Sequence, residues 1–321
     1  MDRGEGMTAP ATAVPDAGRV AAARVGGRRR FRLTRAALVP YCFLLPGIVL
    51  LIIFYFWPAF TALKLAFYNY RLLAPPVWAG LDNFRELRAD PRFAMALKNS
   101  FLFTAMYVPL VVFLPFGLAV LVNQKLRGIQ FFRLLYYLPV VTSMVVVAIA
   151  WNYVFHQKGI LNWLLVSLHI LPKPIQYLLD PTWALPALVV VEAWQALGYY
   201  MMIYLAGLQS LPEDVVEAAR IDGANRWQVL TRITMPLMRP FFSICLIVSA
   251  IGSMQVFTSI YIMTQGGPLD HTLTLGYYIY DEAFNKLNMG YAAAMGLVLW
   301  LILIVMAFVN YRVTKGGEGT L

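Results

Sequence analysis

Six long apolar stretches set the hydrophobic pattern of this chain of 321 residues. Five of them contain no Asp, Glu, Lys or Arg, and the fourth contains a single acidic residue, Glu192. Each is longer than the roughly 20 residues that a helix needs to cross a bilayer. The pattern therefore predicts six membrane-spanning segments with the approximate bounds 36–63, 99–124, 134–157, 183–208, 240–263 and 287–311.

These stretches are predicted to be helices, which makes the fold class an all-α integral membrane protein. A backbone amide cannot stay unpaired in hydrocarbon, and the alternation typical of a membrane β-barrel is missing from the sequence. Prolines within the stretches, such as Pro109, Pro115 and Pro139, predict bent helices. The first stretch has a charge-free run of 28 residues, longer than the roughly 7 to 15 of a cleavable signal, so we expect it to be retained.

Composition favours a membrane protein and excludes several other classes. Hydrophobic residues make up 60% of the chain and charged residues 13%, against about 45 to 50% and about 25% in soluble domains. Cys42 and Cys245 both lie in predicted spans, so neither a disulfide framework nor a cysteine-based metal site is expected. The net charge of +10 comes from basic residues that flank apolar stretches. That placement indicates membrane orientation and lipid contact, and no nucleic-acid partner is expected.

The distribution of Lys and Arg predicts that both termini lie in the cytoplasm. In that orientation the inner segments carry 17 basic residues and the outer segments 9. Without the N-terminal tail, the inner segments still hold 9 in about 50 positions and the outer ones 9 in about 83. The expected organisation is a disordered basic cytoplasmic tail (1–35), a transmembrane domain (36–312) with an external loop (64–98), and a short cytoplasmic tail (313–321).

The most informative polar segment, 210–239, lies between the fourth and fifth spans on the predicted cytoplasmic side. Ser210 and Glu213 have the spacing of a capping box, and Pro212 falls in the first turn, so a short helix is predicted to begin here. Gly223 suits the turn that ends such a helix. The segment therefore predicts one short cytoplasmic helix.

One face of this short helix carries Val215, Ala218, Ala219 and Asp222 at helical spacing. Its small side chains allow another protein surface to approach the backbone closely, as when a helix docks into a groove. A helix lying on the lipid surface is the alternative, but the face is poor in large apolar residues, which weakens lipid binding. Docking on a protein is therefore the favoured interpretation.

The same segment resembles the EAA loop of ABC importer permeases. The family pattern is EAA, three residues, G, nine residues and I-x-L-P, and this chain matches it at 217–219, Gly223, Ile233 and Pro236. Met235 stands where the pattern usually has Leu, which is a volume-conserving change. Further stretches are similar to the sugar-type branch, in particular its maltose-type first subunit: GLDNFRELRADPRF (80–93), FFRLLYYLPVV (131–141), TQGGP (264–268) and YYIYDEAF (277–284).

The resemblance implies an importer type I permease bundle that forms half of a channel and works by alternating access. Its partners would be a second, similar permease, two ATP-binding cassette subunits that bind ATP and Mg, an external sugar-binding protein, and membrane lipid. Its substrate would be a carbohydrate (sugar, oligosaccharide or glycerol phosphate) that crosses the cytoplasmic membrane of a prokaryote. In this family the EAA helix sits in a cleft of the ATPase and transmits its closure, and the residues in that position here are Glu217, Ala218, Ala219, Arg220, Asp222 and Gly223.

The chain itself is expected to be neither an enzyme nor a cofactor-binding protein. It has no G-x-x-x-x-G-K-[ST] phosphate loop, so partner subunits must handle ATP. His156, His169 and His271 are widely separated and form no H-E-x-x-H motif, which argues against a membrane metalloenzyme. An ion-coupled secondary transporter is the other alternative, but such a protein is expected to contain an array of intramembrane ionisable groups that this sequence lacks.

Candidate solute contacts come from polar residues inside the fourth and fifth spans. Glu192, Gln195 and Tyr199 lie at i, i+3 and i+7, which predicts one polar stripe facing a wet cavity. Ser249 and Ser253 are one turn apart, which places both hydroxyls where they can meet sugar hydroxyls. Interhelical hydrogen bonding is common for such side chains in membrane bundles and is the structural alternative for these polar groups.

Overall fold

The computed structural model describes residues 35–124 and 127–315. The predicted N-terminal tail (1–35) lies outside these residues except for Arg35, which begins the first helix. The predicted C-terminal tail (313–321) lies outside them beyond residue 315. The chain divides into two compact units, one ending at Phe56 and the other beginning at Trp57.

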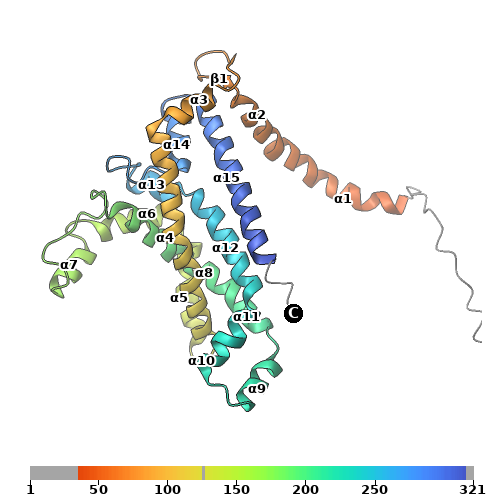
Figure 1. Ribbon diagram of the computed structural model, residues 1–321, viewed down its shortest axis with the longest axis vertical. Helices are drawn as coiled ribbons and strands as arrows, with labels where there is room; N and C mark the ends of the chain where they lie inside the picture. The colour runs from red at the N-terminus through yellow and green to blue at the C-terminus, as the bar shows by residue number, and fades with distance from the viewer. Residues whose placement is uncertain (1–34, 125–126, 316–321) are drawn as a thin grey trace, which may run out of the picture. The chain divides into compact units, whose positions relative to one another are not determined.

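Helices account for nearly all of the regular structure in the described residues (Figure 1). The only strands there, β1 (Tyr68–Asn69) and β2 (Val77–Trp78), pair antiparallel with Tyr68 opposite Trp78. Short π-helical turns occupy Ile52–Phe56, Leu230–Thr234 and Asp281–Asn285. The helices are α1 (Arg35–Leu51), α2 (Trp57–Leu65), α3 (Asp82–Ala89), α4 (Pro91–Val122), α5 (Ile129–Val141), α6 (Met144–Phe155), α7 (Ile160–Ser167), α8 (Ala184–Ser210), α9 (Glu213–Ile221), α10 (Arg226–Val229), α11 (Met235–Leu237), α12 (Arg239–Met254), α13 (Thr258–Met263), α14 (Leu275–Tyr280) and α15 (Met289–Lys315).

The predicted all-α membrane class is confirmed. Five helical segments of the described residues are long and apolar enough to cross a membrane, and a sharply bent pair of helices supplies a sixth candidate. The five are Phe43–Leu65, Pro91–Val122, Ala184–Ser210, Arg239–Met263 and Met289–Arg312, and the bent pair is Ile129–Val141 with Met144–Ser167.

The third predicted span, 134–157, is wrong as a single helix. It is broken between α5 and α6, where the chain bends by 101°. Thr142 and Ser143 both adopt extended ψ angles, 136° and 133°. Pro139 lies three residues before this break and has no amide proton to donate to the helix ladder. The apolar pattern did not indicate this break, because hydrophobicity does not report backbone conformation.

The second predicted span begins earlier than its apolar run. Helix α4 starts at Pro91 and not near residue 99, because the Asp90 carboxylate caps it by accepting a hydrogen bond from the Arg92 amide at 2.8 Å. Pro91 takes the first helical position, where a missing amide costs little. The predicted loop 64–98 therefore shrinks to a hairpin and α3, followed by the first two turns of α4.

The main hydrophobic core of the second unit joins α4, α8, α12 and α15 (Figure 1). The half-buried ring of Phe242 packs against this core, 4.8 Å from Phe116 and 5.0 Å from Tyr204, measured between ring centroids. Aromatic pairs at such distances add to the stabilisation from burial alone. In Figure 1, α9 and α10 lie at one end of these long helices, and α3 and β1 lie at the other end.

Candidate functional site

Helix α9 forms the predicted short helix of the 210–239 segment, but its start differs from the prediction. Pro212 is the N-cap residue, and the Ser210 hydroxyl donates to the Gly207 carbonyl at 2.8 Å, so the predicted Ser210–Glu213 capping box is wrong. Ser210 is the last residue of α8, and it is therefore too far back to cap α9. A capping box does exist at Asn225 and Gln228, at the start of α10.

The end of α9 agrees with the prediction for Gly223. This glycine has a φ of +84°, a conformation that favours glycine, and its amide donates to the Arg220 carbonyl at 3.1 Å. The amide of Ala224 donates to the Ala219 carbonyl at 3.0 Å, which satisfies a second carbonyl of the last turn. Gly223 thus fixes both the length of α9 and the direction of the chain beyond it.

None of the residues of α9 is buried, so this helix projects from the rest of the chain. Of the six predicted coupling residues, Ala219 is half-buried and the other five are exposed: Glu217, Ala218, Arg220, Asp222 and Gly223. Sequence reasoning missed Ile221 and Trp227, whose side chains are 85% and 71% exposed. Large apolar residues in an otherwise charged loop were the available signal for a contact surface.

The segment that follows α9 is anchored in the bundle. Val229 in α10 and Met238, directly before α12, are buried. Gly207 of α8 has no side chain, and a Cβ there would lie 2.7 Å from both Met238 and Phe241. Helices α10 and α11 therefore connect the projecting α9 to the packed α8–α12 core, with no long loop between them.

The predicted polar stripe of α8 lies in two environments. The Ser259 hydroxyl on α13 donates to Glu192 Oε1 at 2.6 Å, and Gln195 Nε2 donates to the Thr142 carbonyl at 3.0 Å. Tyr199, one turn beyond, has a side chain that is 44% exposed. Glu192 and Gln195 thus form hydrogen bonds between helices of this chain, whereas the side chain of Tyr199 is exposed at the surface of the chain.

The two candidate serines of α12 are buried and hydrogen-bonded within the chain. The Ser249 hydroxyl donates to the Leu246 carbonyl of its own helix at 3.1 Å. The Ser253 hydroxyl lies 2.9 Å from Thr104 Oγ1 on α4 and 3.0 Å from the Ala250 carbonyl. Helix α12 ends at Met254, so Ser253 is the second-last residue before the break that precedes α13.

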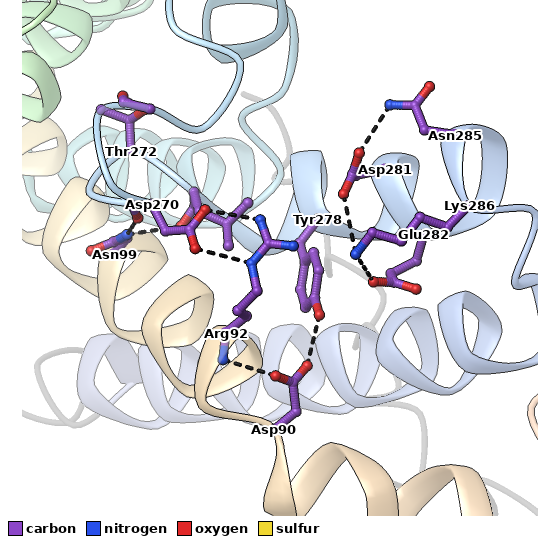
Figure 2. A network of polar contacts seen from close by, with 12 residues as sticks. Asp90, Arg92, Asn99, Asp270, Thr272, Tyr278, Asp281, Glu282, Asn285 and Lys286 are labelled. Carbon is purple, nitrogen blue, oxygen red and sulfur yellow. Dashed lines mark hydrogen bonds and ion pairs between the residues drawn. The ribbon is translucent and has the colours of Figure 1, made fainter.

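A polar cluster at the start of α4 was not found by sequence reasoning (Figure 2). Asp90 accepts hydrogen bonds from the hydroxyls of Tyr278 and Tyr291, both at 2.7 Å, and Arg92 forms a two-point ion pair with Asp270. Arg92 also lies over the ring of Tyr278, 5.2 Å from its centroid. The cluster fastens the 264–274 loop and α14 to α4 and α15.

The charges of this cluster are stabilised in place. The Arg92 guanidinium lowers the pKa of Asp270 below its ordinary value. Burial opposes ionisation of Asp90, but the hydroxyls of Tyr278 and Tyr291, together with the backbone amides of Arg92 and Phe93, outweigh it and lower the pKa of that carboxyl as well. Both carboxylates are therefore ionised at neutral pH. Within the described residues no group of His, Cys, Asp and Glu side chains is arranged to hold a metal ion.

Comparison with known families decides the class of this protein. A family model described as the inner membrane component of binding-protein-dependent transport systems matches residues 90–316, from the N-cap of α4 to the end of α15. The chain belongs to this family. It is an ABC importer permease, as the sequence predicted, and is a transporter subunit and not an enzyme. In such systems the partner ATPases carry out ATP hydrolysis.

Curated relatives cover most of the permease. It is 37% identical over 282 residues to the probable ABC transporter permease protein YesP of Bacillus subtilis, which covers 87% of this chain and 90% of that one. The lactose transport system permease protein LacF of Rhizobium radiobacter is 34% identical over 86% of this chain and 93% of its own length. The diacetylchitobiose uptake permease NgcF of Streptomyces coelicolor is 32% identical over 93% of this chain and 89% of its own length.

Solved structures agree with the family. A bacterial ABC transporter that imports the acidic polysaccharide alginate matches with a TM-score of 0.77 at 25% identity, over 89% of this chain and 98% of that chain. The alginate transporter in complex with its pentasaccharide-bound periplasmic protein matches with a TM-score of 0.76 at 26% identity, over 88% and 96%. This permease is therefore a multi-pass membrane protein of a system that works with a binding protein.

Proposed function

We propose that this permease forms half of the translocation pathway for a carbohydrate (a sugar, oligosaccharide or glycerol phosphate) in the cytoplasmic membrane of a prokaryote. Relatives named for lactose and diacetylchitobiose and a structure named for alginate support this substrate class. The remaining half comes from a second, homologous permease, and an external sugar-binding protein delivers the solute. Both termini and the α9 segment face the cytoplasm, in line with the bias of Lys and Arg.

Transport proceeds by alternating access that separate ATP-binding cassette subunits drive through α9. Those subunits bind ATP and Mg, and this chain holds no cofactor. The observation that carries the proposal is that no residue of α9 is buried, with the EAA residues Glu217, Ala218 and Ala219 on it, together with the direct connection of α9 to the core. A projecting amphipathic helix docks as a unit into a groove of its partner.

The apolar anchors of this docking are Ile221 and Trp227. Large side chains that fill pockets of a partner dominate the energy of an interface, and aromatic residues are enriched among them. Ala218 is exposed and small, which allows close approach of a partner, and the exposed Arg220 and Asp222 supply polar contacts. The six residues of the EAA position and these two anchors make one contact surface.

The solute pathway follows the polar stripe of α8 at the end where Tyr199 lies. Tyr199 is exposed, and Glu192 and Gln195 lie on the same stripe toward the start of α8. Ser249 and Ser253 line the same pathway only if movement during transport uncovers them, because both are buried in this conformation. Aromatic and amide side chains are suited to the ring faces and hydroxyls of a carbohydrate.

Copurification tests the coupling surface. A tagged permease is expressed with its neighbouring transporter subunits, and Ile221→Asp and Trp227→Asp are compared with Leu73→Asp, whose side chain in the β1–β2 hairpin is 89% exposed. The two coupling variants are expected to lose the ATPase subunit while Leu73→Asp retains it. Full ATPase recovery with both coupling variants would refute docking through α9.

Transport in proteoliposomes tests the substrate class. Radiolabelled lactose, diacetylchitobiose and glycerol 3-phosphate are offered with the binding protein, with and without ATP inside. Uptake of at least one should require ATP and persist with an ionophore present. Uptake that an ionophore abolishes would instead support an ion-coupled transporter.

A further inference from the structure

A cavity of about 160 Å³ lies between the first half of α4, the start of α8 and the 264–274 loop. Its apolar lining includes Leu102 and Met106 of α4, and its polar lining includes Lys98 of α4 and His271 of the loop. A cavity of this size is far larger than one water molecule needs. It therefore has room for part of a ligand that carries both a polar and an apolar portion.

The two basic side chains of this cavity have no partner in the chain. Neither Lys98 nor His271 forms a side-chain hydrogen bond or ion pair with another residue that the structure describes. The acidic residues beside the lining segments are already engaged: Asp270 faces Arg92 in the two-point ion pair (Figure 2), and Asp180 Oδ1 accepts from a backbone amide at 2.8 Å. An anionic ligand supplies the missing partner for Lys98, and the imidazole of His271 can donate a hydrogen bond to it.

The polar and apolar linings lie in the order in which a phospholipid carries its two parts. Lys98 is the last charged residue before the charge-free run 99–124, so it lies near the edge of the hydrocarbon. Lys98, Leu102 and Met106 are spaced at i, i+4 and i+8, so they follow one face of α4 into the membrane. Leu102 is 46% exposed, which shows that the helices of this chain cover that face only in part. A lipid with its phosphate at the edge can lay one chain along this face.

We propose that this cavity binds an anionic phospholipid, whose phosphate lies between Lys98 and His271 and whose acyl chain follows Leu102 and Met106. Inorganic phosphate and glycerol phosphate carry the same charged group but have nothing to place on the apolar face, and a neutral sugar has no charge for Lys98. A zwitterionic phospholipid brings its own cation, which competes with Lys98 for the phosphate. The proposed cytoplasmic position of α9 puts the site in the outer leaflet, and lipid binding itself does not depend on the proposed function.

Native mass spectrometry of the complete transporter, in a polyoxyethylene detergent that contains no sugar, tests the class of lipid. Phosphatidylglycerol and phosphatidylcholine with identical chains are added separately, and the wild type is expected to bind phosphatidylglycerol more tightly. Lys98→Ala should weaken phosphatidylglycerol binding about fivefold, the change expected for one basic residue near an anionic lipid. Lys98→Arg keeps the charge and should match the wild type. Equal affinity of the wild type for the two lipids would overturn the inference.

A matched variant and two soluble anions are the controls for this measurement. Arg88 of α3 is also an exposed basic residue without a side-chain partner among the described residues, so Arg88→Ala should bind phosphatidylglycerol as the wild type does. An equal loss in Arg88→Ala and Lys98→Ala would show that the lipid responds only to net charge, which would overturn the site. Inorganic phosphate and glycerol 3-phosphate in large excess should not displace the lipid. Displacement by either anion would assign the cavity to a soluble ligand.

Photo-crosslinking in the same detergent locates the bound lipid. Phosphatidylglycerol with a diazirine in one acyl chain, at limiting concentration, should label the α4 peptide that contains Leu102 and Met106. Lys98→Ala should lower this labelling about fivefold without changing the thermal unfolding midpoint in the absence of lipid, because Lys98 is exposed. No labelling of that peptide, or labelling that Lys98→Ala leaves unchanged, would overturn the site. ATP-driven uptake by the same preparation tests the proposed function separately, so that function stands if only the lipid site fails.

Discussion

Arg92 and Asp270 stand 178 positions apart in the sequence and form a two-point ion pair, with Nε–Oδ2 at 2.9 Å and Nη2–Oδ1 at 2.8 Å. The pair holds a loop in which Gln265, Leu269 and Asp270 all have positive φ angles. Such backbone conformations persist only where surrounding contacts determine them. Arg92 and its neighbour Asn99, which donates to the carbonyls of Asp270 and Leu273, supply those contacts.

Replacing Arg92 with Lys should lower the stability of the permease. Lysine keeps the charge but cannot form the planar two-point contact with Asp270. Both side chains are more than a third exposed, so solvent screens the pair and the expected loss is only about 1 kcal/mol. Thermal unfolding in detergent should show a midpoint a few degrees lower. Arg85→Lys is the matched control, because the Arg85–Asp82 pair is far more exposed and a surface pair contributes little; an equal loss in both variants would contradict the special role of Arg92.

The same cluster predicts loss of stability in acid. Because the folded-state pKa of Asp270 and of Asp90 is lowered from its ordinary value of 3.8, the unfolded chain takes up protons first as the pH falls. The stabilisation is therefore complete above about pH 5 and is lost progressively as the pH falls below 4 and through the folded-state pKa. Unfolding midpoints measured from pH 7 to pH 3 should fall less steeply in Asp270→Asn than in the wild type. If the midpoints of the two proteins fell equally steeply with pH, the Arg92–Asp270 pair would not contribute to the stability of the fold.

Patterns local in the sequence predicted most of the fold. The long apolar runs located α4, α8 and α15 because hydrophobicity and helix length act over neighbouring residues. The segment 210–239 was predicted to contain a short helix, which is α9, although the predicted capping box at its start was wrong. Gly223 marked the end of α9 because one residue decides that turn. Substrate contacts and the orientation in the membrane stay predictions, since they depend on partners that this chain does not contain.

The breaks and the polar cluster depended on long-range contacts that no local pattern carries. The run 134–157 is uniformly apolar, and its break at Thr142 is stabilised by Gln195, 53 positions away. The tyrosine partners of Asp90 lie 188 and 201 positions further on in the sequence. The same limit applied to Glu192, whose partner Ser259 comes from another span.

Gly223 should tolerate asparagine far better than valine. A Cβ at this position meets no atom of the chain within 4 Å, so there is room for a side chain. What favours glycine here is the φ of +84°. Asparagine adopts that region more readily than a β-branched residue, for which the conformation is strained. Gly223→Val and the bulky Gly223→Trp are expected to fray the end of α9 and reduce ATPase recovery in copurification, and Gly223→Asn should stay close to the wild type. If Gly223→Asn fails equally, close approach of the partner and not backbone conformation is what excludes a side chain.

Gly198 of α8 lies directly against the backbone of α5. A Cβ there would lie 2.2 Å from the Tyr136 carbonyl oxygen and 2.9 Å from the Tyr137 Cα, both backbone atoms that cannot move aside cheaply. Gly198→Ala should therefore destabilise the permease by about 1 to 3 kcal/mol through overpacking, despite the better helix propensity of alanine. Gly252→Ala in α12 is the matched control, because a Cβ there meets nothing within 4 Å and the propensity gain of up to about 1 kcal/mol remains. Thermal unfolding of both variants in one detergent should move the midpoints in opposite directions, and a Gly198→Ala midpoint at or above that of the wild type would show that α5 is free to shift along α8.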